Sequence, residues 1–437
     1  MYPNPQDVLP LPPRPDLSHY RKRAKDLVRA CRSDDPGAIR AWAAQWIADL
    51  IELQPGHAAA ADRARLDRPI DQVATFARER LTAAECALSQ AQFVIARGHG
   101  FTSWPKLVTH LEAMAGGSPI SSFEHAADAI VEGDIPTVQR LLREEPDLVR
   151  ARSTREHRAT LLHYVSANGV ENYRQETPPN IVEIARLLLD AGAEVDAEAD
   201  VYGGGATTLL LVVTSAHPRK AGVQNELADL LLDRGARMNA GIIRDCLANG
   251  CPEAAAHLVQ RGAPLDLEEA AGLGRLDAVK GYFDDRGRPR PKTSHSDMVD
   301  ALMMASWYDR VDVVRFLLDS GLEPGVRVEK KGEGNTALHI AAYSGHPRLV
   351  ALLLERGAPV NVIDDHYGTP PLVWALHAWL VENRTPDAPY KAILRMLVDA
   401  SAEVKPHWID DDCIRSDREL FEALSRSIRP QSPPESP

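Results

Sequence analysis

Histidine next to carboxylates is the pattern in this sequence with the clearest capacity for chemistry. His366 follows Asp364 and Asp365, and His407 precedes three aspartates that end at Asp412. Such pairs can bind a metal or act as general acids and bases. However, the sequence has no HExxH motif, no matching ligand pair and no GxSxG motif, and aspartates also belong in turns and at helix N-termini. We therefore predict no catalytic residue, no metal site and no cofactor, while an enzymatic function stays open.

The cysteines offer no alternative metal site. They form no CxxC pair and have no histidine at zinc-ligand spacing. We interpret all of them as buried or incidental thiols in a reducing compartment. They are Cys31, Cys86, Cys246, Cys251 and Cys413.

Three consecutive glycines follow Tyr202, at Gly203, Gly204 and Gly205. Such a stretch could let backbone amides approach an anion. Because no GK[ST] or GxGxxG motif follows, a bend or a flexible loop tip permitted by glycine is the favoured interpretation.

Charge and hydropathy exclude two classes of partner. The formal net charge is −12, which disfavours a general nucleic-acid surface. The sequence shows no charged-then-apolar leader and no apolar run of 18 residues, so we predict a cytoplasmic protein with no membrane insertion.

One stretch shows most clearly which elements position the residues singled out above. It is residues 335–364, with the sequence NTALHIAAYSGHPRLVALLLERGAPVNVID. Small and apolar residues predict a short helix that stops at Gly345, and leucines at i, i+3 and i+4 predict a second helix that stops at Gly357. Such a pair cannot bury its apolar face alone, so stacked neighbours are required.

This stretch resembles one ankyrin repeat. Thr336, Leu338 and His339 match the T-P-L-H start of that family, with Ala337 in place of proline. The resemblance implies that the histidine hydrogen-bonds backbone within and between repeats. It assigns structural roles to Thr160, His163, Thr336 and His339.

Glycines that end each second helix index the remaining units at intervals of 25 to 43 residues, and a further 44 residues lead to Ser401, against about 33 in the family. Ser401 occupies the same position in the last unit. The fold class is therefore predicted as an all-α ankyrin solenoid of about eight irregular helix-turn-helix units with short β-hairpin fingers. The indexing glycines are Gly192, Gly235, Gly262, Gly287, Gly321 and Gly357.

The flanking regions complete the predicted domain organisation. The stretch GFTSWPKL from Gly100 to Leu107 resembles the N-terminal region of bacterial ankyrin repeat proteins. Phe101 and Trp104 within it are predicted to be core residues, with a binding knob as the alternative. The predicted segments are a disordered proline-rich arm at 1–16, a helical domain at 17–117, the array at 120–410, a capping helix at 411–428 and a disordered tail at 429–437.

Three insertions fall between the two helices of a unit, near residues 170–180, 216–225 and 378–390. They should share one edge of the solenoid, which is often a binding face. Their aromatic and basic residues suit recognition, although neutral drift is the alternative. The candidates on this edge are Tyr173, Arg174, His217, Arg219 and Trp379.

The resemblance implies a non-enzymatic scaffold that binds a cytoplasmic protein partner through its fingers and inner helices, and we expect a monomer. The inner-helix candidates are Trp307, Tyr308, Tyr343 and Trp374. The alternative is a small-molecule-binding protein or enzyme whose site is built from the insertions at 170–180 and 216–225.

Overall fold

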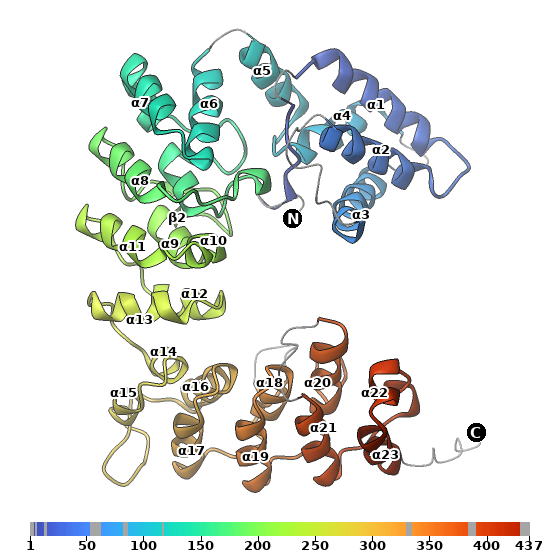
Figure 1. Ribbon diagram of the computed structural model, residues 1–437, viewed down its shortest axis with the longest axis vertical. Helices are drawn as coiled ribbons and strands as arrows, with labels where there is room; N and C mark the ends of the chain where they lie inside the picture. The colour runs from blue at the N-terminus through green and yellow to red at the C-terminus, as the bar shows by residue number, and fades with distance from the viewer. Residues whose placement is uncertain are drawn as a thin grey trace. The chain divides into compact units, whose positions relative to one another are not determined.

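The structure is a computed structural model (Figure 1). It describes residues 4, 7–12, 15–52, 63–81, 86–115, 118–328, 334–382 and 390–428. Helices dominate these residues, and the named strands among them are β1 (Glu198–Ala199) and β2 (Ala206–Thr207), so the all-α prediction is confirmed. The chain divides into two compact units, Met1–Ala254 and Ala255–Pro437.

Unit 1 begins with five helices that enclose an aromatic core. Trp46 and Phe101 are fully buried in it, whereas Trp104 is partly buried at its margin. Phe101 therefore does not form a binding knob. The helices are α1 (Leu17–Cys31), α2 (Ala38–Glu52), α3 (Arg63–Arg80), α4 (Leu88–Gly98) and α5 (Trp104–Ala115).

The described part of the N-terminal arm packs against this core. Val8 and Leu9 are buried, and the Leu9 N–H donates to the Gly98 carbonyl at 2.8 Å. The prediction of a disordered arm is wrong for these residues, because their apolar side chains find a surface that the sequence does not reveal. The predicted tail, 429–437, lies outside the described residues.

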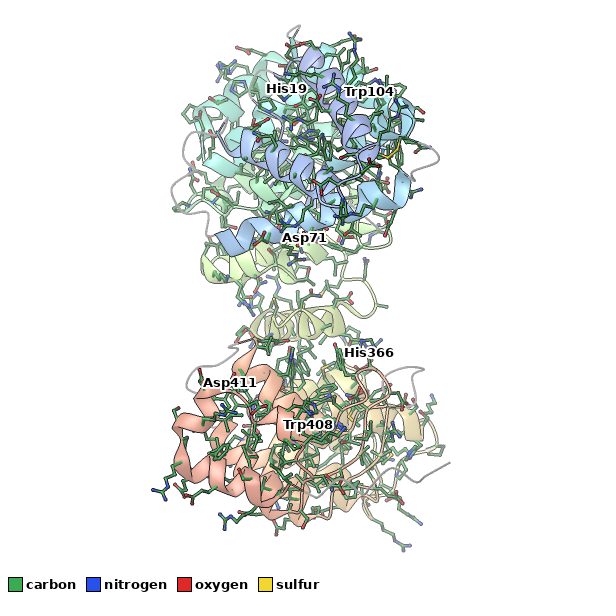
Figure 2. All side chains as sticks on the ribbon, turned by 90° about the vertical axis from the view of Figure 1, so that its right-hand side faces the viewer. His19, Asp71, Trp104, His366, Trp408 and Asp411 are labelled. Carbon is green, nitrogen blue, oxygen red and sulfur yellow. A yellow bond between two sulfur atoms is a disulfide. The ribbon has the colours of Figure 1, made fainter. Side chains whose placement is uncertain are left out.

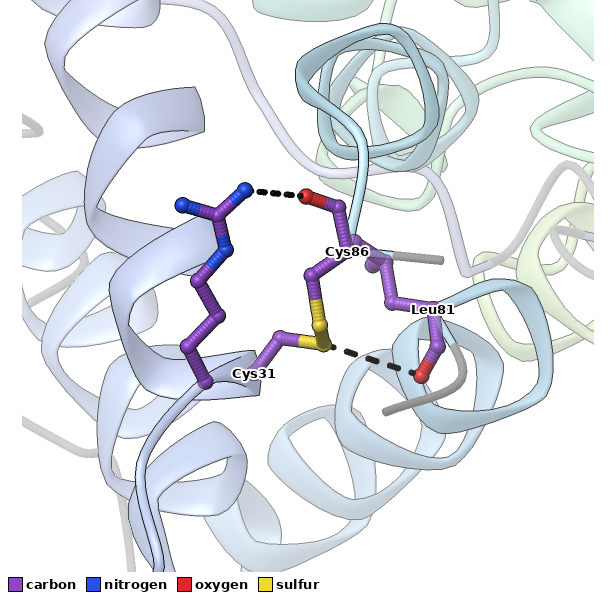
Figure 3. The surroundings of a disulfide bond; sticks show 4 residues. Cys31, Leu81 and Cys86 are labelled. Atoms are coloured by element: carbon purple, nitrogen blue, oxygen red, sulfur yellow. Dashed lines mark hydrogen bonds between the residues drawn. A yellow bond between two sulfur atoms is a disulfide. The ribbon is translucent and has the colours of Figure 1, made fainter. Parts of the chain in front are cut away.

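Cys31 and Cys86 form a disulfide (Figure 3). It joins the end of α1 to the residues before α4, and Arg32 donates to the Cys86 carbonyl at 3.3 Å. The interpretation of all five cysteines as thiols is wrong for this pair. Cys246, Cys251 and Cys413 are free, so only part of the cysteine argument for a reducing compartment is withdrawn.

Helix pairs fill the rest of unit 1. The first helices of consecutive pairs pack against one another, and the second helices form a second row (Figure 1). The pairs are α6 (Pro119–Glu132) with α7 (Ile135–Glu144), η3 (Leu161–Ser166) with α8 (Ile181–Asp190), and α9 (Thr208–Val213) with α11 (Gln224–Asp233). They are followed by α12 (Ile242–Ala248) and then by α13 (Pro252–Gln260), which spans the boundary between the two units. Between them lie η2 (Pro146–Arg150), η4 (Asn172–Arg174) and α10 (Ala216–Lys220).

Unit 2 repeats this arrangement around one continuous hydrophobic core. Its pairs are α14 (Leu267–Gly272) with α15 (Leu276–Lys280), α16 (His295–Trp307) with α17 (Val311–Asp319), α18 (Ala337–Tyr343) with α19 (Pro347–Glu355), and α20 (Pro371–Leu380) with α21 (Tyr390–Asp399). After η5 (Pro406–Trp408), α22 (Asp412–Ser416) and α23 (Arg418–Arg426) close the unit, with Leu420 and Leu424 buried.

Residues with positive φ follow the second helices. Gly192, Gly235 and Gly357 have φ of 96°, 92° and 81°. An L-residue is strained in this region, and glycine is not. Ser401 adopts the same conformation with φ of 71°, so the last pair ends in the same way without the glycine.

Candidate functional site

The first insertion buries its charged residues instead of presenting them to solvent. Arg174 is 3% exposed, and its guanidinium lies 2.7 Å from carboxylate oxygens of Glu124 and Asp128. Arg155 is also buried, and it donates to Glu124 at 3.1 Å and to the Tyr173 hydroxyl at 3.0 Å. Neither Arg174 nor the hydroxyl of Tyr173 is therefore presented as a recognition group on the edge, contrary to the prediction.

The buried cluster is balanced by two glutamates. Glu171 is 0% exposed and forms ion pairs with both Arg155 and Arg174. Burial alone would raise the pKa of Glu124, but the two guanidinium groups hold it at about 2. They likewise hold the pKa of Glu171 well below its usual value. Both carboxylates are therefore ionised, and each guanidinium has an anionic partner.

The same cluster joins the helical domain to the first helix pairs. Arg155 donates to the His99 carbonyl at 3.1 Å and lies over the Phe101 ring at 5.4 Å. The next residue, Glu156, donates its N–H to the Gly100 carbonyl at 2.9 Å. The GFTSWPKL stretch thus contacts the repeats through buried charge.

The two histidines at the start of repeats make structural hydrogen bonds. His163 Nδ1 accepts from the Thr160 N–H at 3.1 Å, and Nε2 donates to the Ala206 carbonyl of the next finger at 3.3 Å. His339 repeats both contacts, with the Thr336 N–H at 3.1 Å and the Thr369 carbonyl at 3.2 Å. Burial lowers the pKa of both imidazoles to about 4, so they are neutral at pH 7.

The second insertion forms helix α10 and borders a cavity of about 590 Å³ in unit 1. His217 is exposed at this cavity, and Gln175 from the first insertion lines it too. Arg219 instead donates to the Gly250 carbonyl, which fixes α10 against the turn after α12. The remaining polar lining includes Asn168, Tyr202, Thr214, Asp245 and Asn249.

Four aromatic residues of unit 2, which we call the aromatic cluster, lie side by side. Trp307 ends α16, Tyr343 ends α18, Trp374 lies in α20, and Tyr367 lies in the loop before α20. The ring centroids are 5.9 Å apart for Trp307 and Tyr343, 5.7 Å for Tyr343 and Trp374, and 6.0 Å for Trp374 and Tyr367. These distances are typical of interacting aromatic pairs.

Hydrogen bonds to two carboxylates hold the aromatic cluster in place, and the residues at its two ends are exposed. The Trp374 indole N–H donates to Asp364 at 3.1 Å, and the Tyr343 hydroxyl donates to Glu382 at 2.8 Å. Burial would raise the pKa of Asp364, but the N–H groups of Tyr367 and Thr369 in its own loop, followed by this indole, hold it at about 2. Trp307 is 37% exposed and Tyr367 is 68% exposed, so a partner can reach both.

The other predicted aromatic residues lie outside this cluster. Tyr308 faces the guanidinium of Arg310 at 5.7 Å, and Trp379 faces the Lys391 ammonium at 5.9 Å. The third insertion falls partly outside the described residues, at 383–389. Sequence reasoning missed Tyr367, Asp245 and Asn249, whose only signal is a polar or aromatic residue in a finger or on the outer face of a helix.

The two histidine–aspartate stretches do not converge. Figure 2 labels His366 and, from within the other stretch, Trp408 and Asp411. Among the described residues, no group of three or more His, Cys, Asp or Glu side chains is placed to hold a metal ion. No helix in the described part of the chain is both long enough and apolar enough to cross a bilayer.

Comparison with known proteins adds to this geometry. A family model described as ankyrin repeats (3 copies) matches residues 180–364 and 302–405. The chain is 38% identical over 128 residues to the mouse B-cell lymphoma 3 protein homolog, which is 29% of this chain and 28% of that protein. It is 44% identical over 54 residues to the serine/threonine-protein kinase TNNI3K of mouse and of rat, which is 12% of this chain and 6% of the kinase. The chain therefore spans well under a third of these relatives.

Proposed function

The chain belongs to the ankyrin repeat family, and from this premise we propose that it is a non-enzymatic scaffold that binds a protein partner through the aromatic cluster. The observation that carries the proposal is the continuous contact of Trp307, Tyr343, Trp374 and Tyr367 across three helix pairs, with exposed rings at both ends.

The chemistry of this surface suits a protein interface. Tryptophan and tyrosine dominate binding hot spots because each combines a large contact area with a directed polar group. Ile363 and Val381, which are 48% and 70% exposed, extend the apolar surface beside the loop and at the end of α20. Among the described residues, four of the six large apolar side chains that are most exposed lie in residues 307–381. Such a concentration marks an interaction site more often than isolated exposed residues do.

Site-specific photo-crosslinking tests this proposal. A benzophenone amino acid at Trp307 or Tyr367 should capture the same partner protein from a native lysate. The same group at Leu88, which is 43% exposed in unit 1, serves as the matched control. Capture of that partner from Leu88 but from neither aromatic position would place the interface elsewhere.

The cavity of unit 1 supports a second candidate function, the binding of a small molecule. Adjacent insertions contribute to one concavity, through Gln175 and His217. Its volume of about 590 Å³ lies within the range of about 300 to 1,000 Å³ found for ligand sites. Thermal-shift screening of the full chain against polar metabolites tests this candidate, with Asn249→Trp as the variant that should fill the cavity and remove any shift.

A further inference from the structure

The cavity of unit 1 is built from segments of three helix pairs. Asn168 follows η3, Gln175 lies in the first insertion, Asp245 lies in the middle of α12, and Asn249 directly follows that helix. Tyr202 of the glycine-rich finger forms part of its rim and is 57% exposed. All of these residues belong to 118–328, a range described without a gap.

The side-chain amides of this cavity turn their nitrogens toward the protein. Gln175 Nε2 donates to the Val170 carbonyl at 2.7 Å, and Asn249 Nδ2 donates to the Asp245 carbonyl at 2.8 Å. A carbonyl can only accept, so these contacts fix which amide atom is the nitrogen. The amide oxygens of Gln175 and Asn249 are left as acceptors for a ligand.

Two hydroxyl groups of the lining, those of Thr214 and Tyr202, also donate toward the protein. Thr214 donates its proton to the Leu210 carbonyl at 2.7 Å, and Tyr202 donates to Asn168 Oδ1 at 2.8 Å. Their protons are therefore committed within the protein. The cavity has a surplus of hydrogen-bond acceptors.

The charge of the lining also favours a ligand that donates hydrogen bonds. Asp245 contributes a carboxylate, and no lysine or arginine is among the lining residues in this described range. No hydrogen bond or ion pair reaches the Asp245 carboxylate from the described residues. The side chain is largely exposed; its partial burial raises its pKa, and the charge of the neighbouring Arg244, which is not among the lining residues, lowers it by less. Burial, followed by the nearby Lys220 charge, lowers the pKa of His217, which is therefore neutral at pH 7. An anionic cavity with surplus acceptors is matched by a cation that carries several N–H donors.

We propose that this cavity binds an organic cation, an ammonium or guanidinium group, which pairs with Asp245 and donates to the amide oxygens of Gln175 and Asn249. The Tyr202 ring at the rim offers an aromatic face to the same charge. The inference rests on the second candidate function above. Two sources supply this chemistry: a free amine, or a lysine or arginine side chain of a bound polypeptide.

Calorimetric titration of the full chain with matched probes tests the proposal. The free probes are 1,4-diaminobutane and agmatine, with 1,4-butanediol as the uncharged match. The peptide probes are end-blocked tripeptides with a central lysine or arginine, with central norleucine as the match. Binding of a cationic probe should weaken at least about tenfold in Asp245→Asn and stay unchanged in Asp285→Asn, an exposed aspartate of unit 2.

Each outcome decides a separate point. Binding of the free amines identifies a small-molecule source, and binding of the cationic peptides alone identifies a polypeptide side chain; both support the proposal. Equal binding of the diol and the diamine, or an unchanged affinity in Asp245→Asn, overturns the cationic ligand class but leaves the cavity as a site. Failure of every probe on a chain shown to be folded by circular dichroism overturns the inference, whereas the second candidate function is overturned only if the thermal-shift screen also finds no ligand whose shift is lost in Asn249→Trp.

Discussion

Replacing Glu171 by glutamine should destabilise unit 1 by about 3–5 kcal/mol, because it removes one anion from a buried set of two arginines and two glutamates. Glu171 is 0% exposed and pairs with Arg155 and Arg174. The neutral amide keeps the shape of the side chain but leaves Glu124 as the remaining fully buried anion for two guanidinium groups. The loss is therefore dominated by uncompensated charge and not by a packing defect.

The assay is urea denaturation followed by circular dichroism, combined with hydrogen exchange read by mass spectrometry. Exchange should accelerate in α4 and α5 as well as in α6, since Arg155 bonds the His99 carbonyl and contacts Phe101. The matched control is Glu194→Gln, an exposed glutamate of the same unit, which should change the free energy of unfolding by less than about 0.5 kcal/mol.

The stability lost in Glu171→Gln should depend on pH. The Arg155 and Arg174 guanidinium groups hold the folded pKa of Glu171 well below its ordinary value of 4.5, so its contribution to stability is complete above the unfolded pKa. That contribution is lost as pH falls below about 4.5 toward the folded pKa. The difference between wild type and Glu171→Gln should therefore shrink in acid. A loss below about 1 kcal/mol at pH 7, or exchange confined to the insertion, would refute the buried charge cluster as the link between the helical domain and the repeats.

Three further predictions concern the repeats themselves. Leu353→Ala should cost roughly 2–5 kcal/mol in urea denaturation because Leu353 is fully buried between helix pairs; a loss well below about 1 kcal/mol would contradict the assigned helix register. Ser401→Gly should stabilise unit 2 by about 1 kcal/mol, since φ at Ser401 is 71°, and an unchanged or lowered midpoint would show that no strain is relieved there. Wild-type stability should fall as pH drops from about 6.5 toward about 4, because the folded pKa values of His163 and His339 are lowered to about 4 and the unfolded state takes up protons first. The slope of stability against pH should be shallower in His339→Asn. Equal slopes in the two proteins would show that His339 does not contribute to the pH dependence.

The repeats were predictable because their signals are local. The helix pairs follow from leucine spacing and from the residue that ends each second helix, and even the serine at 401 falls in its predicted place with positive φ. Helix periodicity reports which residues face the core of a pair. It requires no knowledge of distant segments.

The buried charges and the disulfide were not predictable in this way. Glu124 lies 50 residues before Arg174, and Cys31 lies 55 residues before Cys86. Neither pair has a spacing that marks it, since only the packing of the helical domain on the first repeats brings the partners together. A basic residue in an insertion is predicted to lie at the surface, because the sequence alone does not show its anionic partners.

The candidate sites were predicted in part. The sequence singled out Trp307, Tyr343 and Trp374 as separate inner-helix residues, and the structure brings them into contact with Tyr367 of the finger. Similarly, adjacent insertions were expected to border one pocket, but its carboxylate comes from Asp245 on α12. In both cases the missing residue lies on an element that sequence periodicity describes only as exposed.

Partner affinity measured on purified proteins tests whether the aromatic cluster binds the partner. Biolayer interferometry would compare the wild-type chain with Trp307→Ala, Tyr367→Ala and the exposed control Leu88→Ala, each confirmed as folded by its melting curve. Each aromatic substitution should weaken the affinity for the captured partner at least about tenfold, a loss of about 1.4 kcal/mol or more, while Leu88→Ala should bind like wild type. Equal affinity of all four proteins would contradict recognition through the aromatic cluster.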